Sequence, residues 1–117
     1  MAISLDPEDR ETRESFGACY SIMAAEKADR REFAEAANLM TKAIAVYPHS
    51  PVFHHQRGSC LFHMGEYERA LGDLDEAIRL EPRKPEHYEN RGHCHQRLGR
   101  AEDAEREFKK AAELRNK

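Results

Sequence analysis

The sequence of 117 residues contains no tryptophan, only three cysteines and no long apolar run. A membrane-spanning helix needs about 18 consecutive apolar residues, so we expect no insertion into a membrane. The opening stretch, MAISLDPEDRETRE, lacks the apolar core of a secretory signal. Because the number of cysteines is odd and no CxxC pair is present, they favour a reduced, cytoplasmic protein over a disulfide scaffold.

An excess of positive charge is also missing. The chain has 19 lysines and arginines against 22 aspartates and glutamates, which gives a formal net charge of -3. The two signs are interleaved along the chain, as is typical of solvated helix surfaces and not of a basic nucleic-acid-binding face. We therefore expect a single soluble domain without a nucleic-acid partner.

The sequence shows no motif for catalysis. It has no phosphate-binding glycine loop, no nucleophile elbow and no HExxH motif. Cys19, Cys60 and Cys94 are the only thiols, and a thiol nucleophile needs an orienting base and a pocket. We therefore expect no enzymatic activity and no cofactor.

What the chain does contain is a period of 34 residues, seen most simply where Pro48 recurs as Pro82. The other recurring positions are glycine, alanine or large side chains: Gly58 and Gly92; Gly65 and Gly99; Ala36, Ala70 and Ala104; Ala43, Ala77 and Ala111; Val46, Leu80 and Leu114; Tyr20, His54 and Tyr88. A period of this length is typical of stacked helical hairpins, in which each unit buries its apolar face against its neighbours.

The clearest unit spans residues 51–84. Ser50 is a suitable N-cap, and Pro51 suits the first turn of a helix, where its missing N–H is not needed. Gly65 then breaks the first helix, and Pro82 ends the second. No segment alternates as a strand would, so the chain is expected to be all-α. The pattern predicts helices over residues 51–64, 66–81, 85–98 and 100–115.

Small residues recur where the two helices of a unit are expected to cross. Gly58 and Gly92 lie inside predicted helices, where glycine costs about 1 kcal/mol relative to alanine. That cost is tolerable if a second helix passes close to the backbone. Ala70 and Ala77, seven residues apart on one helix face, would allow this close approach.

Taken together, these residues resemble the tetratricopeptide repeat. The resemblance is carried by Gly58, Leu61, Gly65, Tyr67, Ala70, Leu74, Ala77 and Pro82, and again by Tyr88, Gly92, Leu98, Gly99, Ala104, Phe108 and Ala111. It implies an α-solenoid of about six helices, paired antiparallel and wound into a right-handed superhelix. The implied parts are an N-terminal extension (1–16) and three repeats (17–50, 51–84 and 85–117).

The first unit departs from the pattern. Ala24 stands where the family has glycine inside the first helix, and Arg31 replaces the glycine between the helices. Upstream, Asp6 is a suitable N-cap and is followed by a first-turn proline. We therefore predict one long first helix from about Pro7 to Asp29, although Gly17 lies inside it. The alternative is a disordered N-terminal arm of about a dozen residues.

The last unit has the sequence of a terminal repeat. Leu71 and Ile78 of the middle unit become Glu105 and Ala112 at positions that should face the next hairpin. A polar outer face is what the end of a stack needs. Some apolar surface remains there and would support a homodimer or a partner through these uncapped ends, around Leu98, Ala101 and Leu114.

The resemblance implies that the first helix of each pair lines a concave face that holds an extended peptide or a partner's helix. Our hypothesis is therefore a non-enzymatic adaptor or scaffold for a protein or peptide partner. We expect Ile22 and Phe62 to be apolar anchors, and Gln56, Asn90 and Arg97 to position polar groups. The full expected site is Ile22, Val52, His55, Gln56, Ser59, Phe62, His63, Glu86, Glu89, Asn90, His93 and Arg97.

Three alternatives remain open at this point. One is an oligomerising subunit that uses the edges of the stack. Another is a binder of the acidic C-termini of heat-shock chaperones, which some family members hold with a clamp of lysine, asparagine and arginine. Here Ser21 and Ala25 replace lysine and asparagine, Gln56 replaces asparagine, and Glu86 and Asn90 replace lysine and arginine.

The third alternative is a histidine-based metal or pH sensor. The chain has seven histidines, and histidine titrates near pH 6.5. His55 and His63 share one face of a predicted helix, and Glu89 and His93 should project from the neighbouring one. His93 and His95, by contrast, point to different sides of their helix, so this run does not converge on a tetrahedral zinc.

Overall fold

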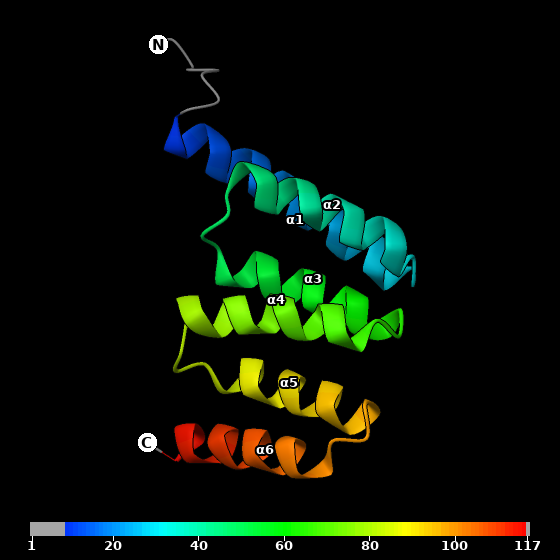
Figure 1. The fold of residues 1–117 in the computed structure, drawn as a ribbon. Helices are drawn as coiled ribbons and strands as arrows, with labels where there is room; N and C mark the ends of the chain where they lie inside the picture. Colours follow the sequence, from blue (N-terminus) through cyan, green and yellow to red (C-terminus); the bar gives the residue numbers. More distant parts are fainter. Residues whose placement is uncertain (1–8, 117) are drawn as a thin grey trace.

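The computed structural model describes residues 9–116, and these form six α-helices stacked as three hairpins (Figure 1). The helices are α1 (Arg10–Asp29), α2 (Phe33–Val46), α3 (Pro51–His63), α4 (Tyr67–Leu80), α5 (Pro85–Arg97) and α6 (Ala101–Arg115). Each helix packs against the next one along the chain, which gives a particle of 55 × 33 × 19 Å. The all-α class and the number of helices were predicted correctly for these residues. None of the six is both long and apolar enough to span a bilayer.

Local signals set the ends of α3 to α6 within one residue of the prediction. The Ser50 side chain accepts a hydrogen bond from the Phe53 backbone N–H at 3.3 Å, and Pro51 lies in the first turn. Gly65 and Gly99 end α3 and α5 with φ of 81° and 77°, which is the left-handed region that glycine adopts without strain.

The start of α1 differs from the prediction. Asp9 has an extended backbone (φ -69°, ψ 124°), and its side chain accepts a hydrogen bond from the Glu11 backbone N–H at 3.0 Å. Asp9 is therefore the N-cap, and the helix begins at Arg10 instead of Pro7. The predicted cap, Asp6, and Pro7 lie outside the described residues. The helix ends at Asp29 as predicted, and its 20 residues make it longer than the other five.

The two helices of a hairpin approach each other closely where the sequence has its smallest residues. A Cβ atom on Gly92 would lie 2.8 Å from the Phe108 ring, and one on Gly58 would lie 3.3 Å from the Cβ of Asp73. The close crossing predicted from these glycines is therefore confirmed. Gly17 has a different role, because a Cβ there would lie 2.7 Å from the ring of Phe53, which reaches α1 from α3.

The core is made of two clusters that follow the stack. The first contains Ala24, Ala36, Ala37, Met40, Ala43 and Cys60; the second contains Leu61, Ala70, Leu71, Leu74 and Cys94. Leu71 is buried, whereas Glu105 and Ala112 in the last hairpin are exposed. The expected polar outer face at this end is therefore present.

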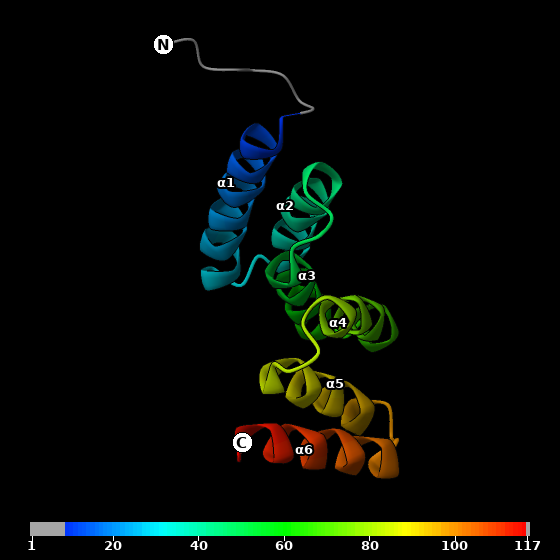
Figure 2. The same cartoon turned by 90° about the vertical axis from the view of Figure 1, so that its left-hand side faces the viewer.

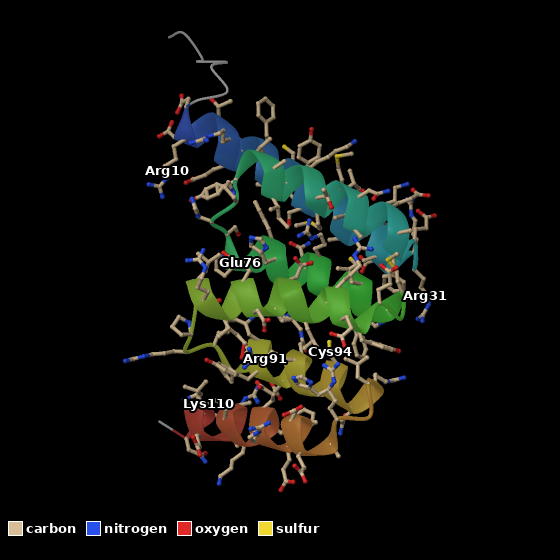
Figure 3. All side chains as sticks on the ribbon, in the orientation of Figure 1. Arg10, Arg31, Glu76, Arg91, Cys94 and Lys110 are labelled. Atoms are coloured by element: carbon tan, nitrogen blue, oxygen red, sulfur yellow. The ribbon has the colours of Figure 1, made fainter. Side chains whose placement is uncertain are left out.

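An arginine–carboxylate pair links the two helices of the second hairpin and again those of the third. Arg57 donates to both carboxylate oxygens of Asp73, at 2.7 and 2.8 Å, and Asp73 is only 6% exposed. One period later, Arg91 donates to Glu107 at 2.9 Å (Figure 3). Such charge-assisted, partly bidentate contacts fix the geometry of the crossing between two helices. The first hairpin has Met23 and Leu39 at these positions.

Arg31, at the turn between α1 and α2 (Figure 3), has a φ of 62°, unlike any other non-glycine residue between 9 and 116. It occupies the position of Gly65 and Gly99, and a side chain in this left-handed conformation costs about 1 to 2 kcal/mol. A glycine at this position would avoid the strain, but it would lose more backbone entropy on folding than arginine does. The entropy loss would offset part of the gain in stability.

Replacing Arg31 with glycine is therefore expected to raise the free energy of unfolding by about 0.5 to 1 kcal/mol, as measured by urea denaturation followed by circular dichroism. The control is Arg31→Ala, which keeps the strain and loses the contact of the guanidinium with the Phe33 ring, 5.8 Å from its centroid. A glycine variant no more stable than the alanine variant would contradict this explanation.

Candidate functional site

The first helices of the hairpins form the inner side of the curved stack. Within the described helices, α1 contacts α3 and α3 contacts α5, whereas α2 does not contact α4 and α4 does not contact α6. The second helices are therefore spread on the outer side. Figure 2 shows the stack from the side, with α1 at its N-terminal end.

All twelve residues of the expected site lie on α1, α3 and α5, and none is fully buried. The exposed ones are Ile22, Val52, His63, Glu86, His93 and Arg97; the half-buried ones are His55, Gln56, Ser59, Phe62, Glu89 and Asn90. Five of them surround one hollow, and several others form hydrogen bonds or ion pairs with other residues of the chain.

That hollow lies between α3 and α5 and has a volume of about 130 Å³. Its walls are formed by Ser59, Phe62, His63, Asn90 and His93, and its floor by Gly58, Leu74 and Cys94. An apolar floor below hydroxyl, amide and imidazole groups suits a small apolar group that is attached to a polar chain. Ile22 and Val52, although exposed, do not line it.

Phe62 supports both the hollow and the core. Its ring packs edge-on against Tyr67, with centroids 5.3 Å apart, and the guanidinium of Arg97 lies over the ring, 5.5 Å from its centroid. It also packs against the second core cluster. Truncating Phe62 should therefore lower stability as well as alter the hollow, and smaller changes at the walls test the site more cleanly.

Gln56 connects two hairpins instead of facing an empty groove. The Ser21 hydroxyl donates to Oε1 of Gln56 at 2.6 Å, and Nε2 of Gln56 donates to the Ser21 carbonyl at 3.3 Å. These two bonds join α1 to α3. The Gln56 amide is therefore engaged, and a ligand would have to compete with Ser21 for it.

A chain of polar side chains joins α3 to α5 beside the hollow. Glu81 accepts from Nε2–H of His87 at 2.8 Å, and with a neutral His87 ring its Nδ1 accepts from Nδ1–H of His55, also at 2.8 Å. Nε2 of His55 then accepts from Nδ2 of Asn90 at 2.8 Å. Both rings have every nitrogen satisfied while they are neutral. His87 is only 2% exposed, so its ring needs these partners for both nitrogens.

The other acidic and imidazole groups on this side have separate partners. Glu86 and Glu89 both face Arg115 of α6, with N–O distances of 3.7 and 2.5 Å. His63 stacks on Phe33 with ring centroids 4.6 Å apart. Between residues 9 and 116, no group of three or more histidine, cysteine, aspartate or glutamate side chains is arranged to hold a metal ion.

Sequence reasoning missed His87 and Glu81, and it missed the two arginine–carboxylate pairs. His87 stands one period after Phe53, so the repeat does predict a large buried side chain at this position, but not its polar partners. The pairs Arg57–Asp73 and Arg91–Glu107 do carry a signal, because an arginine and an acid 16 residues apart recur after 34 residues.

The thiols should differ sharply in reactivity. Burial raises the pKa of the Cys94 thiol to about 11 and also raises the pKa of Cys60, whereas Cys19 is exposed. A protonated, buried thiol is a poor nucleophile. We expect Ellman's reagent at pH 7.5 to modify only Cys19 rapidly in the folded chain, and all three thiols after unfolding in guanidinium. Rapid reaction of a Cys19→Ser variant would contradict the buried placement of the other two.

Stability should depend on pH through His55. Burial, followed by the nearby His87 and Lys84, lowers the pKa of His55 below its ordinary value of 6.5, against the opposing effect of Glu86 and Glu81. As the pH falls below 6.5, His55 binds a proton in the unfolded chain but does not yet bind one in the folded chain. The free energy of unfolding should therefore fall with pH until the folded pKa is reached, and then level off.

A His55→Gln variant tests this linkage because glutamine keeps hydrogen-bonding capacity but does not titrate. Urea denaturation at several pH values between 8 and 5 should show a smaller acid loss for the variant than for the wild type. Parallel curves would show that other histidines carry the pH dependence.

Solved structures of the same fold exist. The first TPR of Spaghetti (RPAP3) bound to the HSP90 peptide SRMEEVD has a TM-score of 0.84 and 22% identity, over 86% of this chain and 80% of that one. The Sgt2 TPR domain from Aspergillus fumigatus has a TM-score of 0.81 and 19% identity, over 86% of this chain and 66% of that one. MamA has a TM-score of 0.83 and 22% identity, over 91% of this chain and 62% of that one. At these identities the likeness establishes the fold alone. No curated protein matches the sequence.

Three family models match the sequence directly. One described as tetratricopeptide repeat matches residues 23–73, one described as TPR repeat matches residues 58–99, and a second tetratricopeptide repeat model matches residues 86–117. Together they cover the chain from residue 23 to its last residue, and the stacked hairpins agree with them. The chain therefore belongs to the tetratricopeptide repeat family.

Proposed function

We propose that the chain is a non-enzymatic protein-interaction module, an adaptor or scaffold, that holds a peptide segment or helix of a partner against its inner face. The observation that carries this proposal is the hollow between α3 and α5. A further support is that a domain of the same fold, the first TPR of Spaghetti, is bound to a peptide. The unpaired cysteines support a cytoplasmic location.

The hollow suits one aliphatic side chain of an extended peptide. Its volume of about 130 Å³ is close to that of the apolar cavities, of about 150 Å³, that accept a benzene-sized group. Leu74 and Cys94 would contact the aliphatic group. The Ser59 hydroxyl and the Asn90 amide at the walls would bind the peptide backbone on either side of it.

The charges on the inner face favour a neutral or basic peptide over an acidic one. Arg97 is the sole arginine or lysine among the twelve site residues, and its guanidinium already lies over Phe62. Glu86 and Glu89 lie on the same face, and Arg115 is paired with them. An acidic C-terminus would therefore meet little uncompensated positive charge, so the chaperone-tail alternative has little support from these side chains.

Self-association through the C-terminal end also has little support. Leu98 and Leu114 are half-buried, Ala101 is exposed but small, and the outer side of α6 is strongly charged. The exposed charged residues there include Glu102, Glu105, Arg106 and Lys109.

Sensing of pH at the same groove is a second candidate, favoured by the position of Asn90. This residue lines the hollow and donates to Nε2 of His55. Protonation of His55 would place a hydrogen on Nε2, opposite the Asn90 NH₂ group, so the amide would have to turn over. Peptide affinity should then change between pH 8 and pH 5.5, and unchanged affinity over this range would remove the candidate.

The groove is tested by filling the hollow. Peptides selected from a random library on the wild type, and measured by fluorescence anisotropy, should bind a Ser59→Tyr variant at least about tenfold more weakly, because the phenol would occupy the space of the peptide side chain. Asn90→Ala should weaken binding less, because it removes one hydrogen bond.

The matched control is Ala45→Tyr, which adds the same side chain at an exposed position of the outer helix α2. It should bind every selected peptide as the wild type does, and thermal melting should show that both tyrosine variants are folded. Equal binding by both variants would place recognition away from the hollow, and a failure to select any peptide would contradict the proposed function itself.

A further inference from the structure

One face of α1 presents apolar side chains to solvent at a regular spacing. Phe16 and Met23 are each 48% exposed although they are large, and Cys19 between them is also exposed. Separations of three and four residues place all three on one side of the helix. Gly17 and Ala24, which face the rest of the stack, are buried. Figure 2 shows no other helix on the far side of α1.

This stripe is not suited to a further hairpin of the same stack. One period after Cys19, Met23 and Glu26 come Phe53, Arg57 and Cys60, and Cys60 is 6% exposed in the core between α2 and α3. A preceding hairpin would therefore bury the carboxylate of Glu26 without a partner, which is unfavourable. In an antiparallel pair of two α1 helices centred between Cys19 and Tyr20, this carboxylate lies level with Arg13 of the other copy. The charged outer side of α6 is no better match, so head-to-tail stacking of copies is also disfavoured.

The residues along the stripe are instead complementary to themselves when the helix is reversed. Asp9, Phe16, Met23 and Arg30 follow one another at intervals of seven residues, the spacing of a helix–helix seam. Phe16 and Met23 are equally far from the midpoint between Cys19 and Tyr20, and so are Asp9 and Arg30. In an antiparallel pair, Phe16 therefore meets Met23 of the other copy, and Asp9 meets Arg30.

We propose that α1 pairs antiparallel with α1 of a second copy of this chain, about a two-fold axis near Cys19. The apolar centre is then covered, and each end has an aspartate opposite an arginine. Parallel pairing would place Asp9 against Asp9 and Arg30 against Arg30, which is repulsive. Lys27, which borders the seam, is held by Glu32 and Glu35 at 3.4 and 3.1 Å and does not oppose this arrangement.

The pairing is reversible and depends on concentration. A helix of 20 residues is about 30 Å long, so a single helix pair offers a small contact, and small interfaces are typical of weak, transient association. The surface is separate from the hollow between α3 and α5, so a dimer keeps that hollow open.

Cys19 reports the pairing directly because it lies beside the axis, while Cys60 and Cys94 are buried. With the full chain, sedimentation velocity should show the dimer fraction rising between about 10 µM and about 1 mM. A short bismaleimide should join two chains through Cys19. Met23→Glu should abolish both signals, because it places four additional carboxylate oxygens at the centre of the seam.

The matched control is Ala25→Glu, on the same helix and also exposed, but turned about 160° away from Met23. It adds the same charge and should leave both signals intact. Both positions are exposed, so circular dichroism should show folded chains, and a monofunctional maleimide should label Cys19 equally in the two variants. The proposal would be overturned if the dimer and the crosslink were lost equally in the two variants. It would also be overturned if the wild type stayed monomeric and uncrosslinked at 1 mM.

The direction of pairing has its own test. Arg30→Glu should weaken the dimer about tenfold, since the contact with Asp9 occurs twice and becomes repulsive. Asp9→Asn, which keeps the N-cap of α1, should recover part of this loss when combined with Arg30→Glu. A dimer unaffected by Arg30→Glu would overturn the antiparallel pairing.

Discussion

The close approach of the two helices in each hairpin is the constraint on which the rest of the molecule depends. At Gly58 and Gly92 the partner helix lies so near that even a methyl group would press on Asp73 or Phe108. This distance brings Arg57 within bidentate reach of Asp73, and Arg91 within reach of Glu107. Successive first helices also touch, so their side chains share one inner face.

The helix ends that were predictable are those decided by a few neighbouring residues. Ser50 and Pro51 start α3, and Gly65 ends it, because capping and left-handed geometry need no distant contact. The start of α1 was not predictable in the same way, since Asp6 and Asp9 are both suitable caps and only the backbone conformation of the folded chain distinguishes them. Arg31 illustrates the opposite case, in which tertiary packing imposes a glycine conformation on a residue that does not favour it.

For the candidate site, the period identifies which helices contribute and which positions face inward, but not which side chains are free. Gln56 and His55 were expected to face a partner, yet they are bonded to Ser21 and to His87. These bonds cross between hairpins and depend on side-chain rotamers and on the tautomers of two imidazoles, which a repeat pattern does not encode. The floor of the hollow comes from three helices, α3, α4 and α5.

Each hairpin contacts only its neighbours in sequence, so the position of a hairpin in the stack determines how stable it is locally. The middle hairpin is covered on both sides and linked internally by Arg57 and Asp73, whereas the first has Met23 and Leu39 at those positions and one side uncovered. Backbone amides should therefore exchange with solvent deuterium most slowly in α3 and α4 and fastest in α1. The molecule would open from its N-terminal end inward, while the helices around the hollow remain folded.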